Sequence, residues 1–220
     1  AEGCYNLSSS KLKLGKFNQK QKEGGQILMK RLLIIGAGGH GKVVAEVAAD
    51  IGYEHIDFLD DTAQEAIGKV SELEKYKNQY NDAFVGIGNN ELRGKFISKL
   101  QDYGYTVPIL VHPSAYVSRT AKIDNGTVIE PKAIVNANSH ISTGCIISVG
   151  AIVDHDAEIG DCCHVNAGAI VKAGGKVESY RKLEAGEVVL GYESAIINAD
   201  SNSDFAKEYE KRTKEDVGFF

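Results

Sequence analysis

A six-residue rhythm of β-branched residues runs through the second half of the chain. A Val or Ile recurs at every sixth position without a miss, and a small residue usually stands two positions earlier. A period of six fits neither an α-helix nor the alternation of a single strand. It fits a triangular solenoid, in which each hexad is one flat side plus a corner and three hexads close a coil. The series is Val111, Val117, Ile123, Ile129, Val135, Ile141, Ile147, Val153, Ile159, Val165, Val171 and Val177.

The rhythm assigns a place to most side chains of this region. The β-branched residues fill the interior of the prism, which makes four coils, and the pattern ends after Val177, with a short closing strand over 187–191. Cys145 and Cys163 are eighteen residues apart, so they are expected to stack inside neighbouring coils as small apolar residues. Cys162 is expected to point outward, as a surface residue or, alternatively, as an acyl-accepting thiol.

The first half follows a different rule. Apolar strands in RLLIIG, HIDFLD, AFVGIG and TVPIL alternate with helical patterns, which indicates βαβ units and a small parallel sheet. The sequence thus predicts four parts: a leader or artefact segment over 1–28, a Rossmann-like domain over 29–110, a β-helix over 111–192 and a helical tail over 193–220. Met29 is the only methionine and is the expected natural start.

A glycine-rich loop follows the first strand of the Rossmann-like part. Gly36, Gly38 and Gly41 satisfy G-x-G-x-x-G, and Asp57 or Asp60 lies about twenty residues on, where a dinucleotide ribose would be read. On spacing alone an NAD site is allowed. We interpret the loop instead as a cradle for nucleotide-sugar phosphates at a helix N-terminus, with Lys42 either adding positive charge or facing solvent.

Composition excludes several classes of function. The net charge of -5 argues against binding to nucleic acid or to an anionic membrane surface. No apolar run is long enough to span a bilayer and no secretory signal is present, so cytoplasmic localisation is expected. The cysteines lack C-x-x-C spacing, and no metal is expected.

Several motifs together resemble a known family. The segments GAGGHGKVV, FLDD, GIGNNELR and VDHDAEIGDCCHVNAGA, in this order, are similar to bacterial hexapeptide-repeat sugar O/N-acyltransferases. Within that family the pattern resembles UDP-4-amino-sugar N-acetyltransferases of bacillosamine synthesis, GDP-perosamine N-acetyltransferases and sialic acid O-acetyltransferases. The resemblance implies a left-handed parallel β-helix, a homotrimer, acetyl-CoA as donor, and active sites between neighbouring subunits.

The same resemblance assigns roles to individual residues. His155 matches the catalytic base, followed by Asp156 where the family more often has Glu, and His164 matches a histidine that contacts acetyl-CoA. Gly191 matches the glycine of the family's closing G-x-P-A. The nucleotide-sugar contacts carry over to Gly39, His40, Gly41, Asp60, Asp61 and Gly88.

These observations predict an acetyltransferase acting on the amine of a nucleotide-linked amino sugar. A histidine titrates near neutrality, so His155 can accept the amine proton, and Asp156 can orient its imidazole. His112 and His140 are expected to be surface residues. The alternatives are a sugar O-acetyltransferase, an NAD-dependent oxidoreductase, and a scaffold without activity. A zinc enzyme of the γ-carbonic anhydrase type is disfavoured because His155 and His164 are too far apart.

Overall fold

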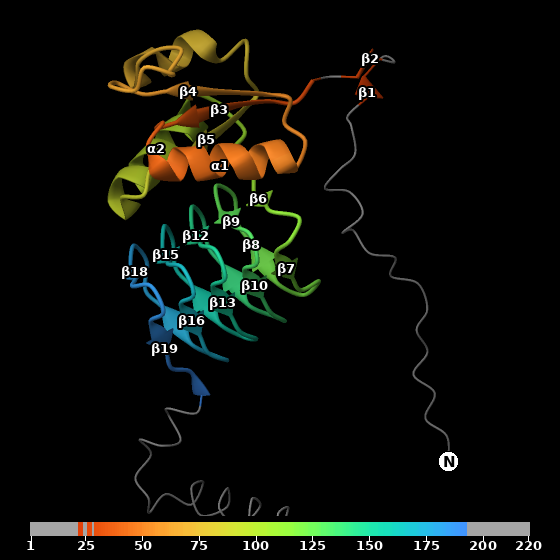
Figure 1. Ribbon diagram of the computed structural model, residues 1–220, viewed down its shortest axis with the longest axis vertical. Helices are drawn as coiled ribbons and strands as arrows, with labels where there is room; N and C mark the ends of the chain where they lie inside the picture. The colour runs from red at the N-terminus through yellow and green to blue at the C-terminus, as the bar shows by residue number, and fades with distance from the viewer. Residues whose placement is uncertain (1–21, 24–25, 28, 193–220) are drawn as a thin grey trace, which may run out of the picture.

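The structure is a computed structural model of the 220-residue chain and describes residues 22–23, 26–27 and 29–192. Figure 1 shows an α/β region stacked on a solenoid, with one helix, α1, lying between the three-stranded sheet and the solenoid. Two short strands, β1 (Lys22–Glu23) and β2 (Gln26–Ile27), pair antiparallel ahead of this body. No helix within these described ranges is long and apolar enough to cross a membrane.

The α/β region contains a small parallel sheet with helices on both faces. Its strands are β3 (Arg31–Ile35), β4 (His55–Leu59) and β5 (Asp82–Val85), arranged in the order β4-β3-β5. Its helices are α1 (Gly39–Asp50), a 3₁₀ helix η2 (Val70–Tyr76) and α2 (Asn90–Asp102). The predicted strands and helices of RLLIIG through NELRGKFISKLQDYG are therefore present, because their apolar patterns are continuous and a glycine follows each element except β4 within two residues.

The predicted final strand TVPIL is wrong as an element of this sheet. Thr106 makes only an isolated parallel bridge to Asp82, and Leu110 already belongs to the solenoid. Pro108 lies between these two positions and has no backbone N–H to donate to a strand ladder, which explains why the segment divides.

The solenoid is a three-sided parallel β-helix, as the rhythm predicts. Each strand has two residues and pairs in register with the strand eighteen residues away, for example Val135 with Val153. The three sheets contain five, five and four strands. They comprise β6 (Leu110–Val111), β7 (Tyr116–Val117), β8 (Lys122–Ile123), β9 (Val128–Ile129), β10 (Ile134–Val135), β11 (His140–Ile141), β12 (Ile146–Ile147), β13 (Ile152–Val153), β14 (Glu158–Ile159), β15 (His164–Val165), β16 (Ile170–Val171), β17 (Lys176–Val177), β18 (Lys182–Leu183) and β19 (Val188–Val189).

The second residue of each strand points inward and the first points outward, so the three sides differ in character. The junction face (β6, β9, β12, β15, β18) lies against the α/β region, where Leu110, Val128 and Ile146 pack with Val44 and Val47 of α1 (Figure 1). The other two sides are the apolar face (β7, β10, β13, β16, β19) and the polar face (β8, β11, β14, β17), and outward residues such as Ile134 on the first and Lys122 on the second are exposed.

The prediction that the hexad pattern ends after Val177 is wrong. Leu183 is fully buried in the prism core, and Val189 packs against that core, so two further hexads continue the solenoid. The predicted closing strand over 187–191 is present as β19. The hexad pattern is nevertheless interrupted in the sequence, because Leu183 is not β-branched and because Arg181 and Glu187 stand where a small residue is usual. These two larger side chains form an ion pair at the surface instead of filling the corner.

The cysteines divide into two environments. Cys145 and Cys163 are fully buried in the prism core, as predicted. The surface prediction for Cys162 is wrong: it points out of the prism, but only 3% of it is exposed because α2 covers this corner. A Cβ built on Gly94 of α2 would lie 3.1 Å from the Cys162 Sγ, so glycine is what permits this close approach. Burial raises the pKa of Cys162, which opposes a role as an acyl-accepting thiolate.

The division of the chain into four parts stays a prediction. The expectation for 193–220 and most of that for 1–28 lie outside the described residues. Met29 is the first residue of the long described range, and its role as natural start also stays a prediction.

Candidate functional site

The glycine loop after β3 turns the chain sharply into α1. Gly36 has a φ of 96°, a left-handed conformation that glycine adopts without strain. A Cβ on Gly41 would lie 2.1 Å from the Gly36 carbonyl oxygen, so Gly41 is required for the tight crossing of helix and loop. Gly38 caps α1 without a side-chain hydrogen bond, which leaves the N–H groups of the first helical turn free to face an anion.

A pocket of about 600 Å³ opens at this helix N-terminus. Five of the six predicted nucleotide-sugar residues line it, whereas Gly41 is buried in the crossing described above and its contact stays a prediction. A Cβ built on Gly38, Gly39 or Gly88 meets no atom within 4 Å, so these glycines leave open space beside the backbone. The lining comprises Gly36, Gly38, Gly39, His40, Asp60, Asp61, Val70, Gly86, Ile87, Gly88, Leu92 and Phe96.

The two pocket aspartates are already engaged by the backbone. Asp60 accepts hydrogen bonds from the N–H groups of Ala37, Thr62 and Ala63, at 2.9, 2.8 and 2.9 Å. These bonds hold the pKa of Asp60 well below its usual range. Asp61 accepts one bond from the Val70 N–H at 3.1 Å. Asp60 therefore shapes the glycine loop, and Asp61 retains more free acceptor capacity for a ligand.

His40 connects the pocket with the solenoid. Its Nδ1 lies 3.7 Å from the Glu130 carboxylate on the junction face, and Glu130 also accepts a bond from the Val149 N–H at 3.0 Å. Burial, and then the positive charge of Arg93, lowers the pKa of His40 to about 4. The His40 Nε2 is buried and has no hydrogen-bond partner among the described residues. A buried polar atom of this kind favours an incoming partner.

His164 lies on the same face of the solenoid. Its Nε2 is 3.0 Å from the Ser148 Oγ on the neighbouring coil. Burial lowers the pKa of His164 to about 4, with further contributions from Arg93 and Lys182. Repulsion between the protonated rings also lowers the pKa of His40, so His164 and His40 are close enough to interact electrostatically. At neutral pH both imidazoles are uncharged.

His155 stands elsewhere, at the corner between the apolar and polar faces. Half of its side chain is exposed, and its Nδ1 lies 2.7 Å from the Asp156 carboxylate. Asp156 has a φ of 57°, and its other oxygen accepts a bond from Asn138 one coil away. The hydrogen bond to Asp156 raises the pKa of His155, and the same bond lowers the pKa of Asp156. The arrangement directs the His155 Nε2 lone pair away from Asp156.

Within one copy of the chain, His155 and His164 lie apart. His155 precedes β14 of the polar face, whereas His164 is in β15 of the junction face, so a whole side of the prism lies between them. The sequence predicts that both side chains point out of the prism. It does not predict that the α/β region covers the face of His164 and not the corner of His155.

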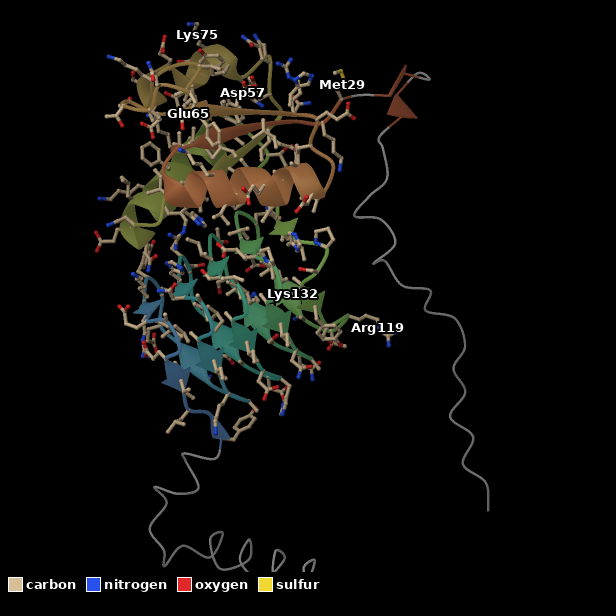
Figure 2. The ribbon with its side chains drawn as sticks, viewed as in Figure 1. Met29, Asp57, Glu65, Lys75, Arg119 and Lys132 are labelled. Carbon is tan, nitrogen blue, oxygen red and sulfur yellow. The ribbon has the colours of Figure 1, made fainter. Side chains whose placement is uncertain are left out.

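Several other candidates have partners of their own. Asp57 accepts a bond from the Tyr80 hydroxyl at 2.5 Å, so it is not free to read a ribose; Figure 2 labels Asp57 within the α/β region. Lys42 pairs with Glu65 at 3.1 Å and is mainly exposed. His140 is exposed beside Asp124, as predicted, whereas His112 is largely covered and bonds to Asp50 at 2.9 Å. No group of three or more potential metal ligands occurs within the described ranges.

Sequence reasoning missed three residues of this region: Arg93, Glu130 and Ser148. Arg93 shares the buried side of α2 with Ile97 and Leu100, and a charge on an apolar helical stripe is a signal for buried polar partners. Glu130 and Ser148 each follow an inward Ile, but the period alone does not show which face of the prism is covered.

Fold and site together define a two-part protein, in which a Rossmann-like region with an open pocket sits on a hexapeptide β-helix. Residues 31–100 match the family model described as the PglD N-terminal domain. The acetyltransferase domain of PglB from Neisseria gonorrhoeae, solved with acetyl coenzyme A, is 36% identical, with a TM-score of 0.70 over 72% of this chain and 81% of that one. PerB from Caulobacter crescentus, solved with CoA and GDP-perosamine, is 30% identical, with a TM-score of 0.67 over 74% and 90%.

The chain therefore belongs to the bacterial hexapeptide-repeat sugar N-acetyltransferase family, and its solenoid is the left-handed parallel β-helix of that family. A curated relative, UDP-N-acetylbacillosamine N-acetyltransferase from Bacillus subtilis, is 31% identical over 46% of this chain. The chain spans about half the length of that relative, 51%.

Proposed function

We propose that this protein transfers the acetyl group of acetyl-CoA to the amine of a nucleotide-linked amino sugar, of the UDP-4-amino-4,6-dideoxy type. The relatives support this proposal, because they are solved with acetyl coenzyme A or with CoA and GDP-perosamine, or are named for N-acetylation of a UDP-sugar. The observation that carries the proposal is the exposed His155–Asp156 pair on the β-helix, in a chain whose α/β region contains a pocket of about 600 Å³ at a glycine-rich helix N-terminus. We place the reaction in the cytoplasm.

The pocket is proposed to hold the nucleotide part of the sugar substrate. The unfilled space beside Gly38, Gly39 and Gly88 lets phosphate oxygens approach the backbone, and the free N–H groups of α1 favour their negative charge. His40 supplies an uncharged hydrogen-bonding atom at the buried end, where a neutral imidazole serves either a donor or an acceptor of the ligand. Asp61 offers a carboxylate oxygen to N–H or O–H groups of the nucleoside.

His155 is proposed as the general base. The amine attacks the thioester carbonyl, so a C–N bond forms, and the His155 Nε2 takes the proton that the nitrogen loses. The C–S bond then breaks, and the CoA thiolate leaves and receives the proton, giving an amide and a free thiol. Asp156 accepts the Nδ1–H, which fixes the tautomer and stabilises the imidazolium. Direct attack by the amine needs no acyl-enzyme, and Cys162, the alternative acyl acceptor, is buried beneath α2.

His164 is proposed to contact acetyl-CoA. Its lowered pKa keeps it uncharged, and its Nε2 bond to the Ser148 Oγ fixes the ring orientation, so that its other nitrogen is presented in one direction. A neutral donor of fixed orientation suits a thioester carbonyl, on which negative charge develops during attack.

A homotrimer is proposed as the working assembly. The outward residues of the apolar face form a ladder of apolar side chains, of which Tyr116 is 57%, Ile134 37% and Val188 46% exposed. A contiguous apolar surface of this kind marks an interaction site. Copies packed through this face would bring the His155 corner of one copy towards the junction region of the next, which supports active sites shared between subunits.

The activity is tested by a thiol-release assay over UDP-, GDP- and CMP-linked amino sugars, with free sialic acid as an O-acetyl acceptor. The expected result is thiol release with a UDP-4-amino sugar and a product stable to hydroxylamine, as an amide is. Release only with sialic acid, or a hydroxylamine-labile ester, would establish O-acetylation. Thermal stabilisation by NADH and none by acetyl-CoA would contradict the proposal in favour of an oxidoreductase.

The assembly is tested by Ile134→Glu, measured by sedimentation equilibrium. A charge at the centre of the apolar face is expected to convert trimers into single subunits. Lys122→Glu, on the polar face, is the matched control and is expected to leave the mass unchanged. A wild-type mass equal to one subunit would remove the trimer from the proposal.

A further inference from the structure

One buried side chain ties the pocket to the solenoid. Arg93 of α2 is 1% exposed, and no carboxylate is among its hydrogen-bond partners. All three of its guanidinium nitrogens donate, and the acceptors are carbonyl oxygens apart from one side-chain amide. The bonds run from Nε to the Gly144 oxygen (2.7 Å), from Nη1 to the oxygens of Ile87 (3.0 Å) and Gly88 (3.2 Å), and from Nη2 to Asn90 Oδ1 (2.8 Å) and the oxygens of Cys162 (2.7 Å) and Cys163 (3.3 Å).

These acceptors belong to two parts of the molecule that contact different substrates in the proposed reaction. Ile87 and Gly88 line the pocket in the α/β region. Cys163 directly precedes His164, and Gly144 lies on the neighbouring coil. The planar fork of one guanidinium therefore fixes the pocket rim relative to the strand that carries His164. Figure 1 shows α2 at the end of the solenoid where β15 and β18 lie.

The desolvation free energy of the buried Arg93 guanidinium indicates a role other than packing. An arginine held by carbonyl oxygens alone loses hydration without gaining an ion pair, and the same attachment could be made by apolar side chains. Its charge acts on both histidines of the region: after burial itself, Arg93 is the largest influence that lowers the pKa of His40 and of His164. The other charged groups facing these two rings are Glu130, beside His40, and Lys182, beside His164.

We propose that Arg93 is a positioning residue that aligns the nucleotide-sugar pocket with the acetyl-CoA-contacting histidine, and that touches neither substrate itself. This inference rests on the proposed function for the identity of the two substrates. Misalignment by about 1 Å is enough to lower a rate by about 10²-fold while each substrate still binds. Arg93 thus controls the geometry between the two substrates more than the affinity for either one.

The variants are Arg93→Lys, which keeps the charge but loses the fork, and Arg93→Gln, which loses both. Arg181→Lys is the matched control, because Arg181 is a surface residue paired with Glu187. Each variant is measured at a temperature well below its own unfolding midpoint. For Arg93→Lys the expected result is a kcat lowered by about 10²-fold, with dissociation constants for acetyl-CoA and nucleotide sugar within about threefold of wild type by the same reasoning.

A second readout does not depend on turnover. In Arg93→Gln the NMR titrations of His40 and His164 are expected to move to higher pH, whereas in Arg181→Lys they stay at their wild-type positions. A folded Arg93→Lys with wild-type kcat, or unchanged histidine titrations in Arg93→Gln, would overturn the inference. If wild-type protein shows no transfer to any acceptor, the proposed function fails, and the titrations alone decide the role of Arg93.

Discussion

Two histidine sites of this protein lie one side of the prism apart and have opposite environments. His155 is half exposed at a corner and bonded to a carboxylate, so the pKa of its imidazole is raised. His40 and His164 lie at the junction of the α/β region and the solenoid, where burial and Arg93 lower their pKa values to about 4. An exposed imidazole paired with a carboxylate is suited to accepting a proton, whereas a buried imidazole beside a positive charge is suited to contacting a ligand in its neutral form.

The contrast shows how one fold places the same side chain in two different environments. The solenoid supplies identical outward positions on every coil, and the difference comes from what covers each position. At the corner half of the His155 side chain stays exposed to solvent. On the junction face the α/β region removes water and adds the charge of Arg93. The following predictions sharpen or break this comparison.

The largest effect is expected from removing the base. His155→Ala is expected to lower kcat by about 10²- to 10⁴-fold, with little change in the KM of either substrate, because the proposed role of His155 is to accept the amine proton in the transition state. Thiol release at saturating substrate measures the change. His140→Ala is the matched control, since His140 is also exposed and paired with an aspartate, Asp124. Turnover of His155→Ala at the wild-type rate would exclude His155 from the mechanism.

The second effect concerns binding at the junction. His40→Ala is expected to raise the KM of the nucleotide sugar about tenfold, which corresponds to the loss of one hydrogen bond of about 1.4 kcal/mol. The KM of acetyl-CoA and the kcat are expected to change much less. Initial-rate kinetics with one substrate varied at a time measure this difference. An equal loss in kcat with an unchanged KM would instead assign His40 to the chemical step.

The third effect is a shift in pH dependence. In the proposed mechanism the neutral form of His155 is the base, and the bond to Asp156 raises the pKa of His155, so activity is expected to fall as the pH drops through that value. Asp156→Asn removes the carboxylate, and the acid limb of kcat/KM is expected to move to lower pH. Asp124→Asn, beside His140, is expected to leave the profile unchanged. A limb that stays in place would show that another group titrates.

The smallest effect is on stability. The pKa of His164 is lower in the folded chain, about 4, than its ordinary value of 6.5. The unfolded chain therefore binds more protons between these two values, and stability is lost as the pH falls from about 6.5 towards 4. His164→Gln is expected to flatten this slope by less than about 1 kcal/mol per pH unit, because solvent screens a half-buried group. Urea unfolding at pH 5 and pH 7 measures it.

The sequence contained most of the fold because both halves have strong periodic signals. The interior position of Val153 follows from the period alone, and so does the stacking of Cys145 on Cys163. The candidate site was harder to predict from the sequence. Which face the α/β region covers is a tertiary property, so neither the burial of Cys162 nor the grouping of His40 with Glu130 follows from any local pattern.

The C-terminal end of the solenoid shows a second limit of prediction from the sequence. Leu183 completes a coil although it breaks the β-branched rule, because any apolar side chain of suitable volume fills the prism. A strict pattern search therefore ended the solenoid too early. Conversely, the segment GIGNNELR predicts a substrate contact only at Gly88, whereas its buried Arg93 forms the hydrogen bonds that connect the two regions.

The central claim, that the corner of one copy works with the junction of another, is tested by mixing two defective variants. His155→Ala lacks the proposed base, and a His40→Ala/His164→Ala double variant lacks the proposed substrate contacts at the junction. Each is assayed alone and after co-assembly, at nucleotide-sugar concentrations below KM. The account predicts that mixed assemblies recover kcat/KM well above the sum of the two separate preparations, because some shared sites contain wild-type residues from both copies. Activity equal to that sum, in assemblies verified as mixed, would contradict it.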